Sequence, residues 1–159
     1  MECLYSVETK ITFNEYRRYV FSLNKRKIII DSIISLFILT LGIILQLLTD
    51  IPFYRNLVIL FPLIYYILIV INYCFGVRKK YNSNKLIQNA NIKFDFYKDF
   101  FEVTDNHGAS KLKYCELYKI IETKTNFYLM VQNGWGYLIL KENMPDGLEL
   151  FIKNLKIVS

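Results

Sequence analysis

Two uninterrupted apolar runs dominate the pattern of hydrophobic and polar positions. The first covers residues 28–48 with a single charge, Asp31, near its edge, and the second covers residues 57–75 with none. At a rise of about 1.5 Å per residue, each run is long enough to cross the roughly 30 Å hydrocarbon core of a membrane as a helix. The polar segment between them, residues 49–56, suits a short external loop. The pattern therefore predicts a transmembrane hairpin over residues 28–75.

A period of two replaces the apolar runs from residue 91 onward. Ile92, Phe94 and Phe96 alternate with polar neighbours, which is typical of a strand with one buried face. Further short β-rich runs are separated by turn-forming clusters and cover residues 101–104, 111–114, 118–124, 127–132 and 137–140. We expect five or six antiparallel strands here. Residues 4–11 are also compatible with a strand, and we expect it to return to the same sheet.

Two further segments have helical patterns. Leu148, Phe151, Ile152 and Leu155 recur at i, i+3, i+4 and i+7, so they form one apolar face that should cover an open side of the sheet. Asp146 with Glu149 three residues later resembles a capping box at the start of this helix. Near the N-terminus, residues 13–24 predict a helix that leads into the first span.

Together these elements predict a membrane α+β protein. A two-helix transmembrane hairpin would be followed by a small antiparallel β-barrel or sandwich, closed by the C-terminal helix. The expected divisions are residues 1–27 as an N-terminal strand and amphipathic helix, the hairpin with its spans 28–48 and 57–75, and residues 86–159 as a cytoplasmic β domain.

Nearly all of the net charge of +6 flanks the two apolar runs. Residues 1–27 carry +3 and residues 78–85 carry +4, whereas residues 86–159 are neutral. The positive-inside rule then places both termini in the cytoplasm, with the protein in the inner or plasma membrane. Nine basic residues are expected to anchor the hairpin at lipid headgroups, and specific recognition of an anionic lipid stays open as an alternative. They are Arg17, Arg18, Lys25, Arg26, Lys27, Arg78, Lys79, Lys80 and Lys85.

The neutral C-terminal part also lacks a basic stripe interleaved with aromatic residues, which argues against a nucleic-acid partner. Cys3, Cys74 and Cys115 are far apart, odd in number and without CxxC spacing, so we expect reduced thiols that behave as small buried hydrophobes. His107 is the only histidine, and no phosphate-binding loop or nucleophile elbow occurs. The sequence therefore predicts no catalytic residue, no metal site and no cofactor.

Trp135 is the strongest candidate for a binding residue. It is the only tryptophan, and Gly134 and Gly136 flank it at an expected hairpin tip, where it could anchor a protein partner, enter the membrane interface or fold back as packing. Lys111 and Lys113 share a face of a predicted strand and are candidates for contact with an acidic partner.

The order of parts and several short motifs resemble the YcxB-like family of bacterial membrane proteins. The motifs are FYKDFFEV at residues 96–103, Gly108 with SKLKY at residues 110–114, and LYKIIET at residues 117–123. The family often has tryptophan where Tyr114 stands, and Pro145 comes late after the last strand. The resemblance implies a pleckstrin-homology-like β domain closed by its C-terminal helix, and it implies no catalytic residue or activity.

Two hypotheses about function follow. The first is a non-enzymatic membrane protein that presents its cytoplasmic β domain for protein interaction, sensing or scaffolding, of which an immunity-type protein against a membrane toxin is a special case. The alternative is a transport or lipid-handling component that acts through its spans. The polar residues within the spans, Ser35, Gln46 and Asn72, are uncharged, which suits helix packing better than an ion path and favours the first hypothesis.

Overall fold

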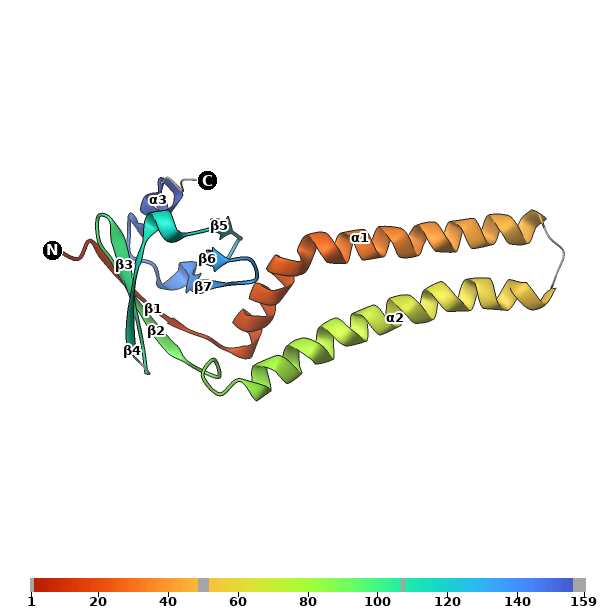
Figure 1. The fold of residues 1–159 in the computed structure, drawn as a ribbon, viewed down its shortest axis with the longest axis horizontal. Coiled ribbons are helices and arrows are strands. Elements are labelled where there is room, and N and C mark those ends of the chain that lie inside the picture. Colours follow the sequence, from red (N-terminus) through yellow and green to blue (C-terminus); the bar gives the residue numbers. More distant parts are fainter. Residues whose placement is uncertain (1, 49–51, 107, 156–159) are drawn as a thin grey trace. The chain divides into compact units, whose positions relative to one another are not determined.

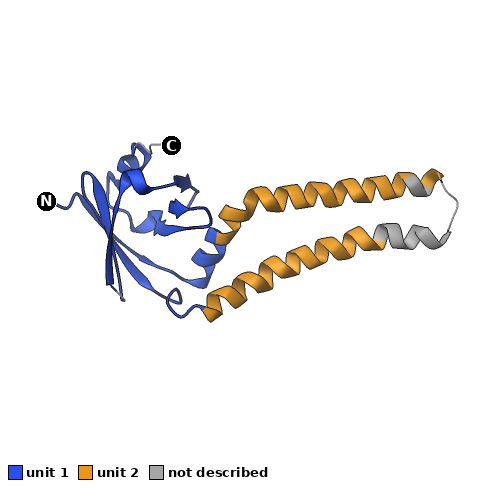
Figure 2. Ribbon diagram, viewed as in Figure 1, with its two compact units in different colours: residues 1–19, 84–159 blue, residues 20–83 orange. Residues whose placement is uncertain are grey.

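The computed structural model describes residues 2–48, 52–106 and 108–155, and it divides into two compact units (Figure 2). One, here the β unit, combines residues 1–19 with residues 84–159. The other, here the hairpin unit, consists of residues 20–83. The N-terminal segment thus belongs with the C-terminal half of the chain rather than forming a part of its own.

The chain has two long helices, α1 (Phe13–Leu48) and α2 (Pro52–Ser83), and the hairpin unit contains α2 and all of α1 from residue 20 onward. α1 runs from the predicted N-terminal helix into the first apolar run without interruption. The predicted loop over residues 49–56 is wrong from Pro52 onward, because α2 begins there. Proline suits the first position of a helix, where its fixed φ fits and no amide hydrogen is needed. Residues 49–51 lie outside the described part of the chain.

Both helices contain stretches long and apolar enough to cross a membrane, Phe13–Ile44 and Leu60–Ser83. Only 11% of the most apolar window in each is buried. Phe37 and Phe61, for example, are 66% and 72% exposed. A core helix of a water-soluble protein buries most of such side chains, and these two helices do not.

The β unit holds two antiparallel sheets (Figure 1). The four-stranded sheet has the order β1 (Tyr5–Lys10), β2 (Asn91–Phe96), β3 (Phe100–Asp105) and β4 (Gly108–Lys113), and the three-stranded sheet has the order β5 (Lys119–Glu122), β6 (Asn126–Gln132) and β7 (Trp135–Leu140). β1 pairs with β2 from Tyr5 opposite Phe96 to Lys10 opposite Asn91. This pairing confirms that the N-terminal strand returns to the sheet.

Of the expected barrel or sandwich, the described residues form two separate antiparallel sheets, and no strand pairing joins them into a closed barrel. The chain passes from β4 to β5 through η1 (Tyr114–Glu116), a turn of 3-10 helix. It begins at Tyr114, the last residue of the β-rich run predicted over residues 111–114. The Tyr114 hydroxyl donates a hydrogen bond of 2.7 Å to the Tyr97 carbonyl, and its ring stacks on Phe101. These contacts hold Tyr114 in the core, so the chain turns before a continuous sheet can form.

The core lies between the two sheets. Phe94, Phe96 and Phe101 are fully buried and belong to one apolar cluster with Leu129 of β6 and residues of β7 and α3 (Leu148–Lys153). The predicted alternation of β2 is therefore confirmed.

Helix α3 adds Leu148 and Ile152 to this cluster, which confirms its predicted apolar face. The predicted capping box is wrong. Gly147 is the N-cap residue, at φ 89°, and no side chain caps the helix. The Glu149 carboxylate instead accepts hydrogen bonds from Lys141 of η2 (Lys141–Asn143) and from Lys153.

The cysteine prediction holds in one respect and fails in the other. Cys3, Cys74 and Cys115 are free, as expected, but all three are exposed. Cys3 lies before the first strand, and Cys115 lies in the η1 turn, outside the apolar cluster. A small apolar side chain is buried only where its element directs it into the core, and the side chains of the three cysteines are not directed there.

Candidate interaction site

Trp135 is the first residue of β7, opposite Gln132 of β6, and only Asn133 and Gly134 form the turn between them. The expected four-residue tip over residues 133–136 is therefore too long. The indole ring is 48% exposed and meets Tyr137 edge to face, with 5.3 Å between ring centroids. Trp135 thus contacts Tyr137 within the β unit and leaves about half of its surface exposed.

Backbone geometry accounts for both neighbouring glycines. Gly134 has φ of 85°, a left-handed conformation that a two-residue hairpin turn favours and that side chains disfavour. At Gly136, an added Cβ would overlap the Leu129 carbonyl oxygen. The glycines therefore serve the hairpin itself, and Trp135 is the side chain that this hairpin presents.

The β6–β7 turn lies beside the first turns of α1. The Tyr19 hydroxyl donates a hydrogen bond of 3.5 Å to the Gly134 carbonyl, and the Tyr19 ring meets Tyr128 edge to face at 5.3 Å. Both contacts lie within the β unit, so Trp135 follows a turn that packs on the start of α1.

A buried polar contact, which the sequence did not predict, fixes α1 to β6. Glu15 is 8% exposed, and its Oε2 accepts a hydrogen bond of 2.7 Å from Nδ2 of the fully buried Asn126. Its Oε1 accepts a second, also of 2.7 Å, from Arg18. The Thr12 hydroxyl accepts a hydrogen bond from the Glu15 amide at the helix start. The Thr-x-x-Glu spacing could have identified this helix start, but nothing local points to a partner 111 residues away.

Lys111 and Lys113 lie on the outer face of β4, at the edge of the four-stranded sheet. Lys111 is opposite Glu102, and its Nζ is 3.5 Å from the centroid of the Phe100 ring, a cation–π contact. Lys113 is opposite Phe100. Trp135 belongs to the other sheet. The structure thus does not combine the three candidates into one site, and Lys111 already has partners within the domain.

The nine basic residues expected at lipid headgroups are all exposed. Two of them have contacts in the β unit: Arg18 pairs with Glu15, and the Arg17 guanidinium lies 5.9 Å from the Phe13 ring centroid. Lys85 is also in the β unit, whereas the other six belong to the hairpin unit. The exposed side chains of these six residues can therefore meet charged groups outside the protein.

A surface cluster of four charges ties α3 to the end of the three-stranded sheet. Lys141 bridges Glu122 and Glu149 at 2.6 and 3.0 Å, and Lys153 bridges the same two carboxylates at 2.9 and 2.8 Å. Hydrogen bonds from Lys141 and Lys153 hold the pKa of Glu122 below its usual range, and those from Lys153 and Lys141 do the same for the pKa of Glu149. The cluster thus links α3 and η2 to the end of β5 through four ion pairs.

Among the residues that the structure describes, no group of three His, Cys, Asp or Glu side chains could hold a metal ion. His107 lies outside the described residues. The expectations of no catalytic residue, no cofactor and no metal stay predictions.

Comparison with known proteins gives a family match for part of the β unit. Residues 96–155, from the end of β2 through α3, match the family model of YcxB-like proteins. This match confirms the resemblance drawn from the sequence motifs, which fall almost entirely in the same segment. No curated protein and no solved structure is significantly similar to the chain.

Proposed function

We propose that this chain is a non-enzymatic membrane protein that presents its YcxB-like β unit at the cytoplasmic face for protein interaction, sensing or scaffolding. The two exposed apolar helices support a membrane-spanning hairpin. The basic residues on both sides of that hairpin support cytoplasmic termini. Sheets of four and three strands with a C-terminal helix agree with a pleckstrin-homology-like arrangement.

The single observation that carries the interaction function is the exposed indole of Trp135. Large aromatic side chains are enriched at the energetic centres of interfaces, because they bury much surface at little cost in side-chain entropy. Trp135 is presented by a hairpin whose glycines are required by the backbone, so the exposed ring is not a by-product of core packing. Fold alone does not specify a ligand, and the proposal therefore rests on this side chain.

A photocrosslinking residue at position 135 tests this role in native membranes. Tyr118 is the matched control, since it is also aromatic and is 56% exposed. We expect a protein adduct of discrete mass from position 135 and none from position 118. Trp135→Ala should reduce recovery of the same protein without lowering the midpoint of thermal unfolding.

The outcomes separate the alternatives. Adducts with lipid alone would assign Trp135 to membrane anchoring and overturn the proposed protein interaction. Loss of stability in Trp135→Ala without loss of association would assign the indole to packing. If the adduct partner is a membrane-active toxin, the protein is of the immunity type, a special case of the same function.

The membrane topology has its own test. In a background without the native cysteines, single cysteines at positions 53 and 110 report the two sides of the membrane. An impermeant reagent applied to intact cells should label position 53 and not position 110. Labelling of position 110 alone would reverse the proposed orientation.

One observation supports the alternative function, a transport or lipid-handling role of the hairpin: a cavity lined partly by charged and polar side chains lies within the hairpin unit.

A further inference from the structure

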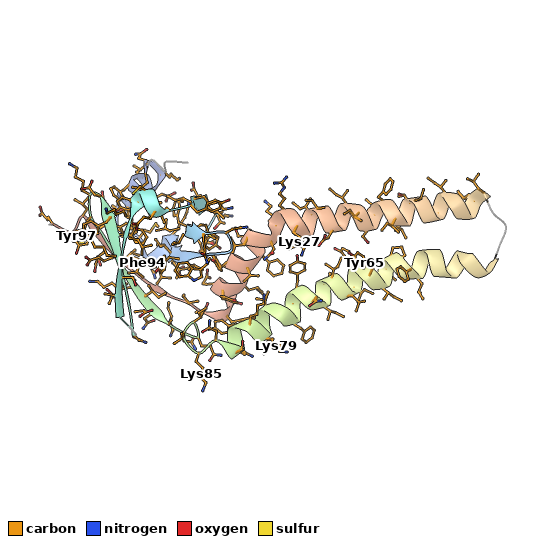
Figure 3. All side chains as sticks on the ribbon, in the orientation of Figure 1. Lys27, Tyr65, Lys79, Lys85, Phe94 and Tyr97 are labelled. Atoms are coloured by element: carbon orange, nitrogen blue, oxygen red, sulfur yellow. The ribbon has the colours of Figure 1, made fainter. Side chains whose placement is uncertain are left out.

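A cavity of about 540 Å³ lies between α1 and α2 within the hairpin unit. Its lining positions recur every three or four residues along both helices, so one face of each helix forms a wall. Lys27 and Asp31 contribute from α1, and Tyr65, Leu68, Asn72 and Lys80 are among those from α2. Figure 3 marks the two walls with Lys27 and Tyr65. The volume falls within the range of about 300–1,000 Å³ typical of small-molecule sites.

The lining side chains lie at different depths in the cavity. The two helices run antiparallel, so residue numbers rise along α1 and fall along α2 toward their connection (Figure 1). Lys80 and Val20 therefore lie at the end away from the connection, Lys27 lies further in, and Asp31 and Leu68 lie nearer the connection. A lipid head at the two lysines would direct its acyl chains toward the connection.

Three formal charges line the cavity, those of Lys27, Lys80 and Asp31, and their sum is +1. None of the salt bridges among the described residues involves these side chains. A charged group at the edge of a membrane requires a counter-charge or water, because hydrocarbon does not solvate charge. The cavity thus has an uncompensated positive charge next to an apolar wall.

We propose that this cavity binds one monoanionic glycerophospholipid, such as phosphatidylglycerol, with its phosphate at Lys27 and Lys80 and its acyl chains along Leu68 and Tyr65. The single negative charge of one phosphodiester group neutralises the net formal charge of +1 on the lining side chains. A zwitterionic lipid would leave the positive charge uncompensated, and a dianionic lipid would add a charge that Asp31 repels. The inference rests on the proposed membrane placement of the hairpin, but not on any role of Trp135.

Native mass spectrometry of the full chain, released from nanodiscs of equimolar phosphatidylglycerol, phosphatidylcholine and cardiolipin, measures the preference. We expect phosphatidylglycerol to be retained most. Lys27→Gln and Lys80→Gln should each lower its retention about fivefold, the equivalent of about 1 kcal/mol per cation. Lys98→Gln and Lys119→Gln are controls, because these exposed lysines of the β unit neither line the cavity nor flank the apolar runs. They should change retention by less than about twofold.

Asp31→Asn separates a built site from general attraction to anionic lipid. It raises the formal charge of the lining from +1 to +2, so the preference should shift toward dianionic cardiolipin. An unchanged preference, or equal losses from all four lysine variants, would overturn the site. Retention of a second copy of the chain in place of lipid would overturn it as well.

Extraction of membranes with alkaline carbonate distinguishes failure of the site from failure of the membrane placement. If the wild-type chain is released by carbonate, the hairpin does not span the membrane and both proposals fail. If it stays in the membrane without lipid preference, only the lipid site fails. Circular dichroism of each variant in the same nanodiscs establishes that its helices are intact.

Discussion

Removing the carboxylate of Glu15 should loosen the attachment of the first turns of α1 to β6 within the β unit. In the structure this carboxylate accepts hydrogen bonds from the buried Asn126 and from Arg18, both at 2.7 Å. Glu15→Ala removes the acceptor for both donors. It also leaves one Asn126 donor with only the weaker contact of 3.3 Å to the Tyr128 hydroxyl.

The expected loss of stability follows from the exposure of each partner. Glu15 and Asn126 are 8% and 0% exposed, and a buried hydrogen bond to a charged group contributes about 1.5–3 kcal/mol. The Arg18 side chain is 52% exposed, so its ion pair adds at most about 1 kcal/mol. Glu15→Ala should therefore lower the free energy of unfolding of the β unit by about 1.5–4 kcal/mol.

A double-mutant cycle of Glu15→Ala and Asn126→Ala isolates the buried contact. Urea unfolding in detergent micelles can be followed by the fluorescence of Trp135, the only tryptophan. We expect a coupling energy of about 1.5–3 kcal/mol. Glu8→Ala, at an exposed position of β1, is the control and should change stability by less than about 0.5 kcal/mol. A coupling energy below about 0.5 kcal/mol would refute the buried hydrogen bond as the link.

Three further predictions concern the β unit. Gly136→Ala should lower the unfolding midpoint strongly in thermal denaturation, because its Cβ would overlap the Leu129 carbonyl oxygen, and an unchanged midpoint would contradict that close approach. Deletion of residues 1–10 should expose the edge of β2, and the shortened chain should unfold at a lower urea concentration and aggregate more than the full chain. Acid should destabilise the β unit, because the pKa values of Glu122 and Glu149 are lowered in the folded state. The two carboxylates stabilise the fold at a pH above the carboxyl pKa of the unfolded chain. This stabilisation is lost as the pH falls through the carboxyl pKa of the folded chain. The Glu122→Gln variant should show a weaker dependence of stability on pH between about 5 and 3.

Local periodicity predicted much of the fold, because helices and strands repeat with periods that burial imposes on the sequence itself. The apolar runs predicted both long helices, and the alternation of Ile92, Phe94 and Phe96 predicted β2. The spacing of Leu148 and Ile152 predicted the buried face of α3. The motifs of the β unit were also sufficient to identify the YcxB-like segment.

The candidate sites depended on contacts between distant residues. Trp135 was predicted as a binding residue from its type and its glycines, but its place beside Tyr19 arises only when α1 packs on the β6–β7 turn. Glu15 and Asn126 are polar residues without any local signal of pairing, and only the folded chain brings them within 2.7 Å. The Glu149 carboxylate had a plausible local role as part of a cap, but two lysine ammonium groups attract it more strongly. Sequence patterns thus determined the elements, because these form from neighbours along the chain, whereas pairing across the chain determined which polar and aromatic groups meet.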